Sequence, residues 1–170
     1  MAQSINAQAL DSVQMRQRSE SSLWKLRLAL GLGTLFGVVM DLFALSWDIQ
    51  WHSAVGRDRT LTAPHLFILG GIIISGLVAL TAVLIETRWA RRDASLAKRS
   101  TSFAGLFSSS LGAYLVGYGS LASAIAFPID QYWHTLYGID VSIWAPFHIM
   151  AISGLCVSCL GVAYMLANSA

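Results

Sequence analysis

The sequence predicts an all-α integral membrane protein with four transmembrane helices. Its 170 residues are 55% hydrophobic and only 12% charged, with a mean hydropathy of +0.60. The apolar residues fall into four long blocks, at 28–47, 64–85, 103–129 and 141–170. Each block has about the ~20 residues that a helix needs to cross the hydrocarbon core, or more. Because a soluble domain of this length could not bury so much apolar surface, we expect one polytopic membrane domain.

The basic residues predict which side of the membrane each loop faces. Nine Lys and Arg residues precede the first block or lie between the second and third, and only two lie elsewhere. Loops rich in Lys and Arg stay in the cytoplasm, so we expect both termini and the basic loop 88–102 to be cytoplasmic. The other two loops then face the periplasm or exterior of a bacterial plasma (inner) membrane. The placement of these charges requires no nucleic-acid partner, and the expected partner is the lipid bilayer.

Residues 1–24 form a polar segment of mixed charge before the membrane domain at 25–170. No short apolar stretch with a small-residue cleavage site precedes the first block, so we expect no cleavable signal. The segment is weakly amphipathic at best. It is interpreted as a flexible or surface-lying cytoplasmic tail, with a partner-binding helix as the alternative.

Two segments, 48–65 and 130–148, carry the same motif. The pattern is D-x-x-W-H-x-x-x-G-x-D-x-x-x-x-A-P-(x)-H, and it contains all four histidines of the chain. The copies lie 82 residues apart, and 83 apart after a one-residue insertion in the second copy. This duplication predicts two parallel helix–loop–helix repeats, at 25–87 and 103–170, related by a pseudo-twofold axis along the membrane normal.

The spacing within each copy brings an Asp and two His together. Asp48 and His52 are four residues apart on one helix face, and His65 follows a proline that suits the first turn of the next helix. A carboxylate and two imidazoles are a plausible ligand set for a divalent transition metal. The predicted metal ligands of the second copy are equivalent, and a further Asp in each copy is a fourth ligand or orients an imidazole. The eight residues are Asp48, His52, Asp58 and His65, and Asp130, His134, Asp140 and His148.

Other interpretations of the motif stay open. The Asp and His residues could form a structural hydrogen-bond network at the outer loops, or the imidazoles could ligate a haem or pigment. If metal binds, the two copies form either two separate sites or one dinuclear site near the axis. The spacing does not choose between these two geometries.

Three further features concern ionisable or sulfur-bearing side chains within the apolar blocks. Asp41 lies two helical turns before Asp48, and its cost at that depth predicts either a proton-transfer role or a hydrogen bond to Tyr114 or Tyr118. Glu86 is expected to be solvated at the cytoplasmic end of the second span. The CxxC pair, Cys156 and Cys159, is interpreted as ordinary helix packing rather than as a redox or metal motif.

The segment 48–65 resembles the metal-binding stretch of the C subunit of copper membrane monooxygenases, the methane and ammonia oxidisers. That subunit carries an Asp, a His four residues on and another His thirteen beyond, and Asp48, His52 and His65 match this spacing. The Trp before the first His and the Arg-Asp pair also match. In the second copy the last His is one residue late and Ile139 replaces the Arg.

The resemblance implies copper as the metal and a role as a subunit or relative of a copper-dependent oxidase or monooxygenase. The remaining monooxygenase subunits would be separate membrane chains, and homo-oligomerisation is the alternative. Zinc and non-haem iron also suit one carboxylate and two imidazoles. Two rival functions are a metal carrier or storage protein, and a structural or pigment-positioning subunit of a larger membrane complex. No catalytic residue is predicted beyond Asp41 as a possible proton relay.

Overall fold

The structure, a computed structural model, describes residues 2–56, 61–138 and 144–168. It is almost entirely helical, as predicted, and four of its helices are long and apolar enough to cross a membrane. Side chains are described from residue 21 onward, and at two positions before it. The elements are α1 (Ala2–Ala54), α2 (Ala63–Ala90), α3 (Ala94–Lys98), β1 (Thr101–Phe103), β2 (Phe107–Ser109), α4 (Leu111–Tyr137) and α5 (Pro146–Ala167).

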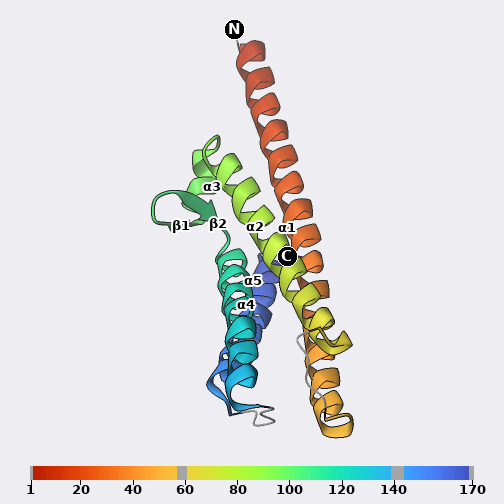
Figure 1. Ribbon diagram of the computed structural model, residues 1–170. Coiled ribbons are helices and arrows are strands. Elements are labelled where there is room, and N and C mark those ends of the chain that lie inside the picture. The colour runs from red at the N-terminus through yellow and green to blue at the C-terminus, as the bar shows by residue number, and fades with distance from the viewer. Residues whose placement is uncertain (1, 57–60, 139–143, 169–170) are drawn as a thin grey trace.

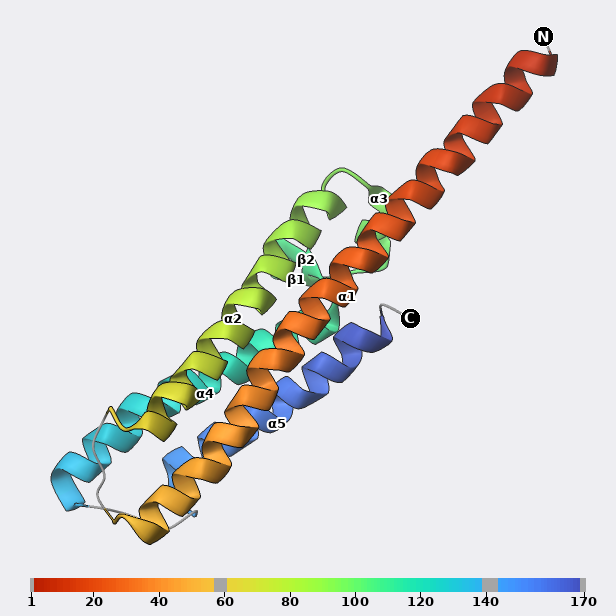
Figure 2. The same cartoon turned by 90° about the vertical axis from the view of Figure 1, so that its right-hand side faces the viewer.

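The four long helices form an antiparallel bundle. Helices α1 and α4 run in one direction, and α2 and α5 return in the other (Figures 1 and 2). Sequence neighbours pack most extensively, α1 against α2 and α4 against α5, while α2 contacts α4 and α1 contacts α5. Both connections that carry the motif therefore lie at the same end of the bundle, which we call the motif end.

Glycines bring the helices of each pair into close contact. A Cβ atom added at Gly71 of α2 would lie 2.7 Å from the carbonyl oxygen of Gly37 in α1. One added at Gly154 of α5 would lie 2.6 Å from the carbonyl oxygen of Gly119 in α4. These two contacts occupy equivalent positions of the two copies. These contacts therefore keep the two helices of each pair at similar backbone separations, at a level inside the bundle from the motif end.

The N-terminal segment is helical rather than a tail. Helix α1 is continuous from Ala2 to Ala54 and extends well beyond the rest of the bundle (Figure 1). The expectation of a flexible segment was therefore wrong for the backbone, while a surface-lying segment and a partner-binding helix both stay predictions. The segment lacks Gly and Pro, so no residue in it interrupts a helix that the first apolar block initiates.

Helix α4 begins later than the third apolar block, whose first residues the composition predicts to be helical. Residues 103–110 are not part of α4, because β1 and β2 pair as a short antiparallel hairpin that precedes it. Ser110 then caps α4 through its side-chain oxygen, which accepts from the amide of Ala113 at 3.3 Å. Polar Ser and Thr residues around this hairpin favour turn and cap conformations over a helix interior.

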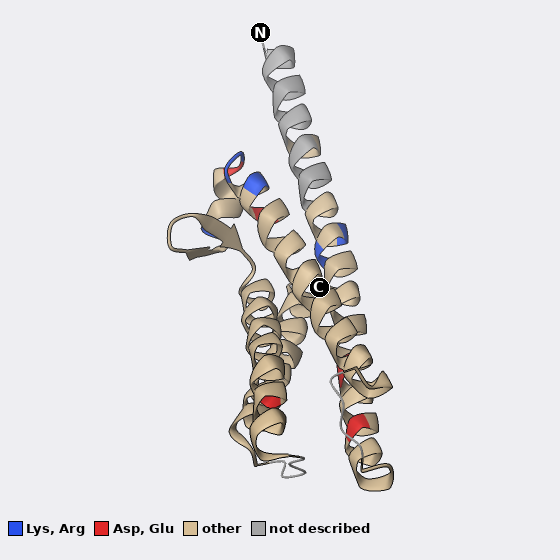
Figure 3. Ribbon diagram, in the orientation of Figure 1, with Lys and Arg blue, Asp and Glu red and all other residues tan. Residues whose placement is uncertain are grey.

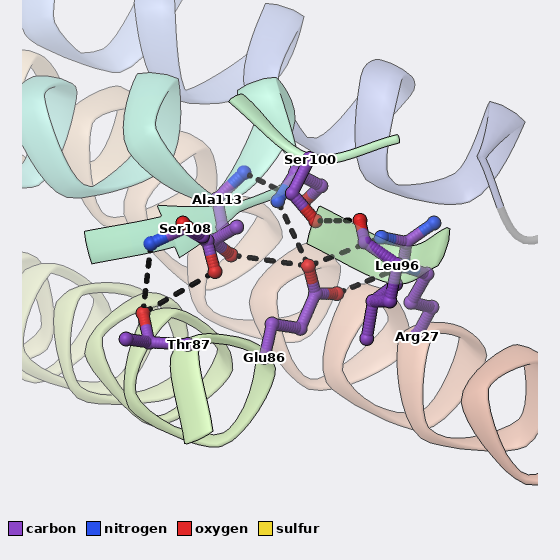
Figure 4. A network of polar contacts seen from close by, with 9 residues as sticks. Arg27, Glu86, Thr87, Leu96, Ser100, Ser108 and Ala113 are labelled. Carbon is purple, nitrogen blue, oxygen red and sulfur yellow. Dashed lines mark hydrogen bonds and ion pairs between the residues drawn. The ribbon is translucent and has the colours of Figure 1, made fainter. Parts of the chain in front are cut away.

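Glu86 is buried in a polar network, so the prediction that it is solvated was wrong. Its side chain is 1% exposed, and Arg27 of α1 donates to it from Nε at 2.8 Å and from Nη2 at 3.1 Å (Figure 4). The amide of Ser110 and the hydroxyl of Ser109 donate to the same carboxylate at 2.9 and 3.3 Å. This Glu86 cluster ties α1, α2 and the start of α4 together. It lies near the end of the bundle where basic residues gather, opposite the motif end (Figure 3).

Candidate metal centre

The first copy of the motif brings its Asp and two His together, as predicted. Asp48 and His52 are on the last turns of α1, and His65 is the third residue of α2. The Nε2 atom of His52 lies 3.5 Å from Asp48 Oδ2, and that of His65 lies 3.2 Å from Asp48 Oδ1. One donor atom from each of the three residues lies within 4.8 Å of the other two. We call these residues the first triad.

The second copy has the same arrangement. The Nε2 atoms of His134 in α4 and His148 in α5 lie 3.1 and 3.4 Å from Asp130 Oδ1. These residues form the second triad. Among the residues that the structure describes, only the first triad brings all three donor atoms within 4.8 Å of one another, so the second is the more open of the two.

A shift in the start of a helix absorbs the one-residue insertion in the second copy. Helix α2 begins at the Ala before its proline, whereas α5 begins at the proline itself. As a result His65 and His148 are each the third residue of their helix. The prolines occupy the first turn, as predicted, where a missing N–H leaves no hydrogen bond unmade.

Glycines end the first helix of each copy in the backbone conformation that the turn requires. Gly56 has φ 64° and Gly138 has φ 83°, both in the left-handed region that favours glycine. The Gly138 amide donates to the carbonyl of His134 at 3.1 Å, which closes the last turn of α4. Asp58 and Asp140, the predicted fourth ligands, lie outside the described residues.

The carboxylates of the triads keep buried oxygen atoms without hydrogen bonds. Within the described chain, Asp48 Oδ1 and Asp130 Oδ1 are buried and meet no hydrogen-bond donor in acceptable geometry. Each nevertheless lies 3.1–3.4 Å from one or two imidazole nitrogens. A carboxylate oxygen with two imidazole nitrogens converging on it is the arrangement expected of ligands around a cation. The donor set, one carboxylate oxygen and two imidazole nitrogens, therefore fits a transition-metal ion.

Neighbouring groups fix the orientation of three imidazoles. His134 Nδ1 lies 2.9 Å from the Gly138 carbonyl oxygen, which can only accept, so Nδ1 donates this hydrogen bond and the contact turns Nε2 toward Asp130. The ring of His65 packs edge-on against Phe127 of α4, with centroids 5.7 Å apart. Phe147 packs against His148, with centroids 4.5 Å apart. Aromatic packing of this kind leaves each ring few alternative orientations.

Both triads line one cavity of about 90 Å³. His65 of the first triad is also close enough to Asp130 of the second to interact with it electrostatically. The two triads therefore share a chamber between the helix pairs. The cavity is lined by Asp41, Leu45, Asp48, His52, His65, Ile68, Ile72, Ser123, Ala126, Phe127, Asp130, His134, Phe147, His148, Ala151, Ile152 and Leu155.

Asp41 lines this cavity but makes neither of the predicted hydrogen bonds. Its Oδ1 atom and the hydroxyl of Tyr114 are both buried without a hydrogen-bond partner in the part of the chain that the structure describes. Tyr118 is half exposed and packs against Phe103. The prediction of a hydrogen bond between Asp41 and either tyrosine was therefore wrong, and the proton-transfer alternative stays a prediction.

Sequence reasoning missed the aromatic residues that pack on the imidazoles. Phe127 lies three residues before the first Asp of the second motif, so its place on the same helix face was a usable signal. Phe147 was recognised only as an insertion. Cys156 is exposed, Cys159 is partly buried against the core, and neither lines the cavity.

Comparison with known proteins gives no relative from which a function could be transferred. No protein-family model, curated protein or solved structure matches this chain significantly.

Proposed function

We propose that this chain is a membrane metalloprotein whose two triads each bind a divalent transition-metal ion. The observation that carries the proposal is the pair of buried carboxylate oxygens, Asp48 Oδ1 and Asp130 Oδ1, which lie beside imidazole nitrogens without hydrogen bonds. An unpaired buried oxygen costs free energy that a bound cation recovers. The ligands would be Asp48, His52 and His65 in one site, and Asp130, His134 and His148 in the other.

Copper is the proposed metal. The resemblance of residues 48–65 to a copper membrane monooxygenase subunit favours it, and both triads offer nitrogen and oxygen but no sulfur. A triad of three protein ligands leaves coordination positions open, which suits catalysis better than storage. When bound, copper would supply redox chemistry with dioxygen. We therefore propose a role as a subunit or relative of a copper-dependent oxidase that works with other membrane chains.

The proposed topology follows from the distribution of charge. The described Lys and Arg side chains gather at one end of the bundle (Figure 3). The triads lie near the ends of α1 and α4 and the starts of α2 and α5, which form the other end. The positive-inside rule then puts both termini in the cytoplasm and the triads at the periplasmic or outer face. Matched helix directions, glycine contacts and triads support two parallel repeats that arose by duplication.

Metal content per chain tests the proposal. The protein would be purified from native membranes, and copper, zinc and iron counted by elemental mass spectrometry with EPR on the same sample. We expect one copper per triad, with loss of one equivalent in His52→Ala and of the other in His134→Ala. Cys156→Ser is the matched control, because this exposed thiol lies outside the cavity, and it should keep full metal.

The other outcomes identify the rival functions. Wild-type protein without stoichiometric metal would exclude the metal sites and leave the triads as structural contacts between helix ends. Full copper that exchanges within minutes, with no dioxygen consumption in the assembled complex, would indicate a carrier or storage protein. Unchanged metal in His52→Ala would exclude the first triad.

A further inference from the structure

Among the residues that the structure describes, Asp41 is the one carboxyl group that lines the shared cavity and belongs to neither triad. The residue is 7% exposed, and its Oδ1 atom has no hydrogen-bond partner among the described residues. It lies seven residues before Asp48 on α1, which at 1.5 Å per residue is about 10 Å deeper into the bundle. The polar groups that line the cavity therefore lie at two levels, the triads near the helix ends and Asp41 deeper in the bundle.

The equivalent position of the second copy holds a polar side chain that does have a hydrogen-bond partner. Ser123 of α4 also lines the cavity, but its hydroxyl donates to the carbonyl of Ala151 at 3.0 Å. On the first-copy side, Gly71 leaves room for the larger carboxyl, because a Cβ there would lie 3.0 Å from Asp41 Cγ. The two helix pairs match in their packing at this level, and they differ in this one unpaired carboxyl.

A carboxyl group buried without a partner at this depth is costly, and such groups mark sites of function. Apart from Ser123, whose hydroxyl donates to Ala151, the other described residues of the cavity wall beside Asp41 are aliphatic or aromatic and cannot pair with it. A hydrogen-bond donor held in the cavity would be such a partner. The apolar wall residues are Leu45, Ile68, Ile72, Ala126, Phe127, Ile152 and Leu155.

We propose that the cavity binds a small molecule with a short alkyl body and one hydrogen-bond-donating end, a hydroxyl or amino group, and that Asp41 accepts that hydrogen bond. The alkyl body lies along the apolar wall and points toward the triads. A cavity of about 90 Å³ limits such a molecule to a few non-hydrogen atoms. This inference rests on the proposed function, and it names the class of substrate that the metal sites would meet.

The test uses metal-free wild-type protein in lipid nanodiscs, so that binding is measured apart from metal chemistry. The probes are a terminally fluorinated propanol and its isomer, fluoroethyl methyl ether, followed by fluorine NMR. The two isomers have the same atoms, but only the alcohol donates a hydrogen bond. Since hydrogen bonds to charged groups are the stronger ones, we expect the alcohol to bind roughly tenfold or more tightly than the ether. Terminally fluorinated propylamine is the third probe, and it separates amino from hydroxyl preference.

Three variants assign the preference to Asp41. Asp41→Leu removes the acceptor, keeps the number of side-chain heavy atoms and should bind alcohol and ether equally. Asp41→Asn keeps a carbonyl acceptor without the charge, so it should retain part of the alcohol preference and lose any preference for the amine. Cys156→Ser, at an exposed position outside the cavity, is the control, and it should behave as the wild type. Metal content should be unchanged in all three variants.

The outcomes separate this inference from the proposed function. Equal binding of alcohol and ether by the wild type would overturn it, as would an undiminished alcohol preference in Asp41→Leu. No binding of any probe by a wild-type protein that takes up copper normally would also overturn it, and would leave the metal sites standing. If Asp41→Leu does not fold, Asp41→Asn decides the question: a smaller alcohol preference than that of the wild type supports the inference, and an undiminished one overturns it.

Discussion

The bundle carries one buried polar cluster toward each end, and the two differ in how their carboxylates are paired. In the Glu86 cluster, Arg27 donates to both oxygens of Glu86, and Ser109 and Ser110 donate to one of them (Figure 4). At the motif end, Asp48 and Asp130 each keep a buried oxygen outside any hydrogen bond that the described chain offers.

Because of this difference, we expect one cluster to act in stability and the other in ligand binding. A buried network whose members are all paired holds its elements in one arrangement, and removing one partner is costly. A cluster that leaves oxygens unpaired destabilises the empty protein, and it gains free energy when a ligand supplies the missing charge. We therefore expect the Glu86 cluster to determine whether the bundle forms, and the triads to determine what it binds.

The largest expected effect on stability comes from removing the carboxylate of the Glu86 cluster. Glu86→Ala leaves the Arg27 guanidinium, which is 13% exposed, without its carboxylate, and this should destabilise the folded protein by roughly 3–5 kcal/mol. Unfolding by denaturant in detergent micelles measures the change. Arg88→Gln, an exposed position two residues on, is the control and should cost little. Wild-type stability in Glu86→Ala would contradict the structural role of the cluster.

The next largest effect on stability is expected when metal is removed from the two triads. Metal that binds only the folded state at a hundredfold excess over its Kd stabilises the protein by about 2.7 kcal/mol. Chelation of the wild-type protein should therefore lower its melting temperature, and the double variant His52→Ala/His134→Ala should show no such shift. A double variant that still loses stability on chelation would place the metal elsewhere in the chain.

The sequence predicted the helices that form the bundle because their apolar blocks are long and nearly free of charge. It predicted both triads because the i, i+4 spacing of Asp48 and His52, and of their counterparts, places each pair on one helix face. The partner of Glu86 could not be predicted in this way. Arg27 is 59 residues away, and only the antiparallel packing of α1 and α2 brings the two side chains to the same level.

The shared cavity could not be predicted from the sequence either. The motif left one dinuclear site and two separate sites equally possible, since no spacing within a copy reports the distance between copies. Contacts of α2 with α4 bring the two copies together, including the packing of His65 on Phe127. The unpaired state of Asp41 likewise depends on which side chains of three other helices fail to reach it.

A smaller effect is expected from the glycine that supports the second triad. Gly138 has φ 83° and ψ −166°, a conformation that is essentially restricted to glycine, so Gly138→Ala should cost roughly 1–3 kcal/mol. The substitution should also displace the carbonyl that accepts from His134 and so weaken metal binding at the second triad. Gly56→Ala is the matched variant, with φ 64° at the equivalent turn. Metal titration of both variants should show weaker binding at the second triad only in Gly138→Ala. An equal loss of metal affinity in both variants would mean that the Gly138 carbonyl does not orient His134.

The smallest effect compares the two triads directly. The three donor atoms of the first triad lie within 4.8 Å of one another, and the His65 side chain is 6% exposed, whereas that of His148 is 31% exposed. A more compact and more buried donor set needs less rearrangement to close on an ion. We therefore expect the first triad to bind copper about tenfold more tightly, a difference of ~1.4 kcal/mol. Stepwise titration of the metal-free protein with copper, followed by EPR, measures this order: His65→Ala should abolish the tighter step and His148→Ala the weaker one. If both variants abolish the tighter step, the triads do not bind independently, and the shared cavity holds one coupled pair of ions.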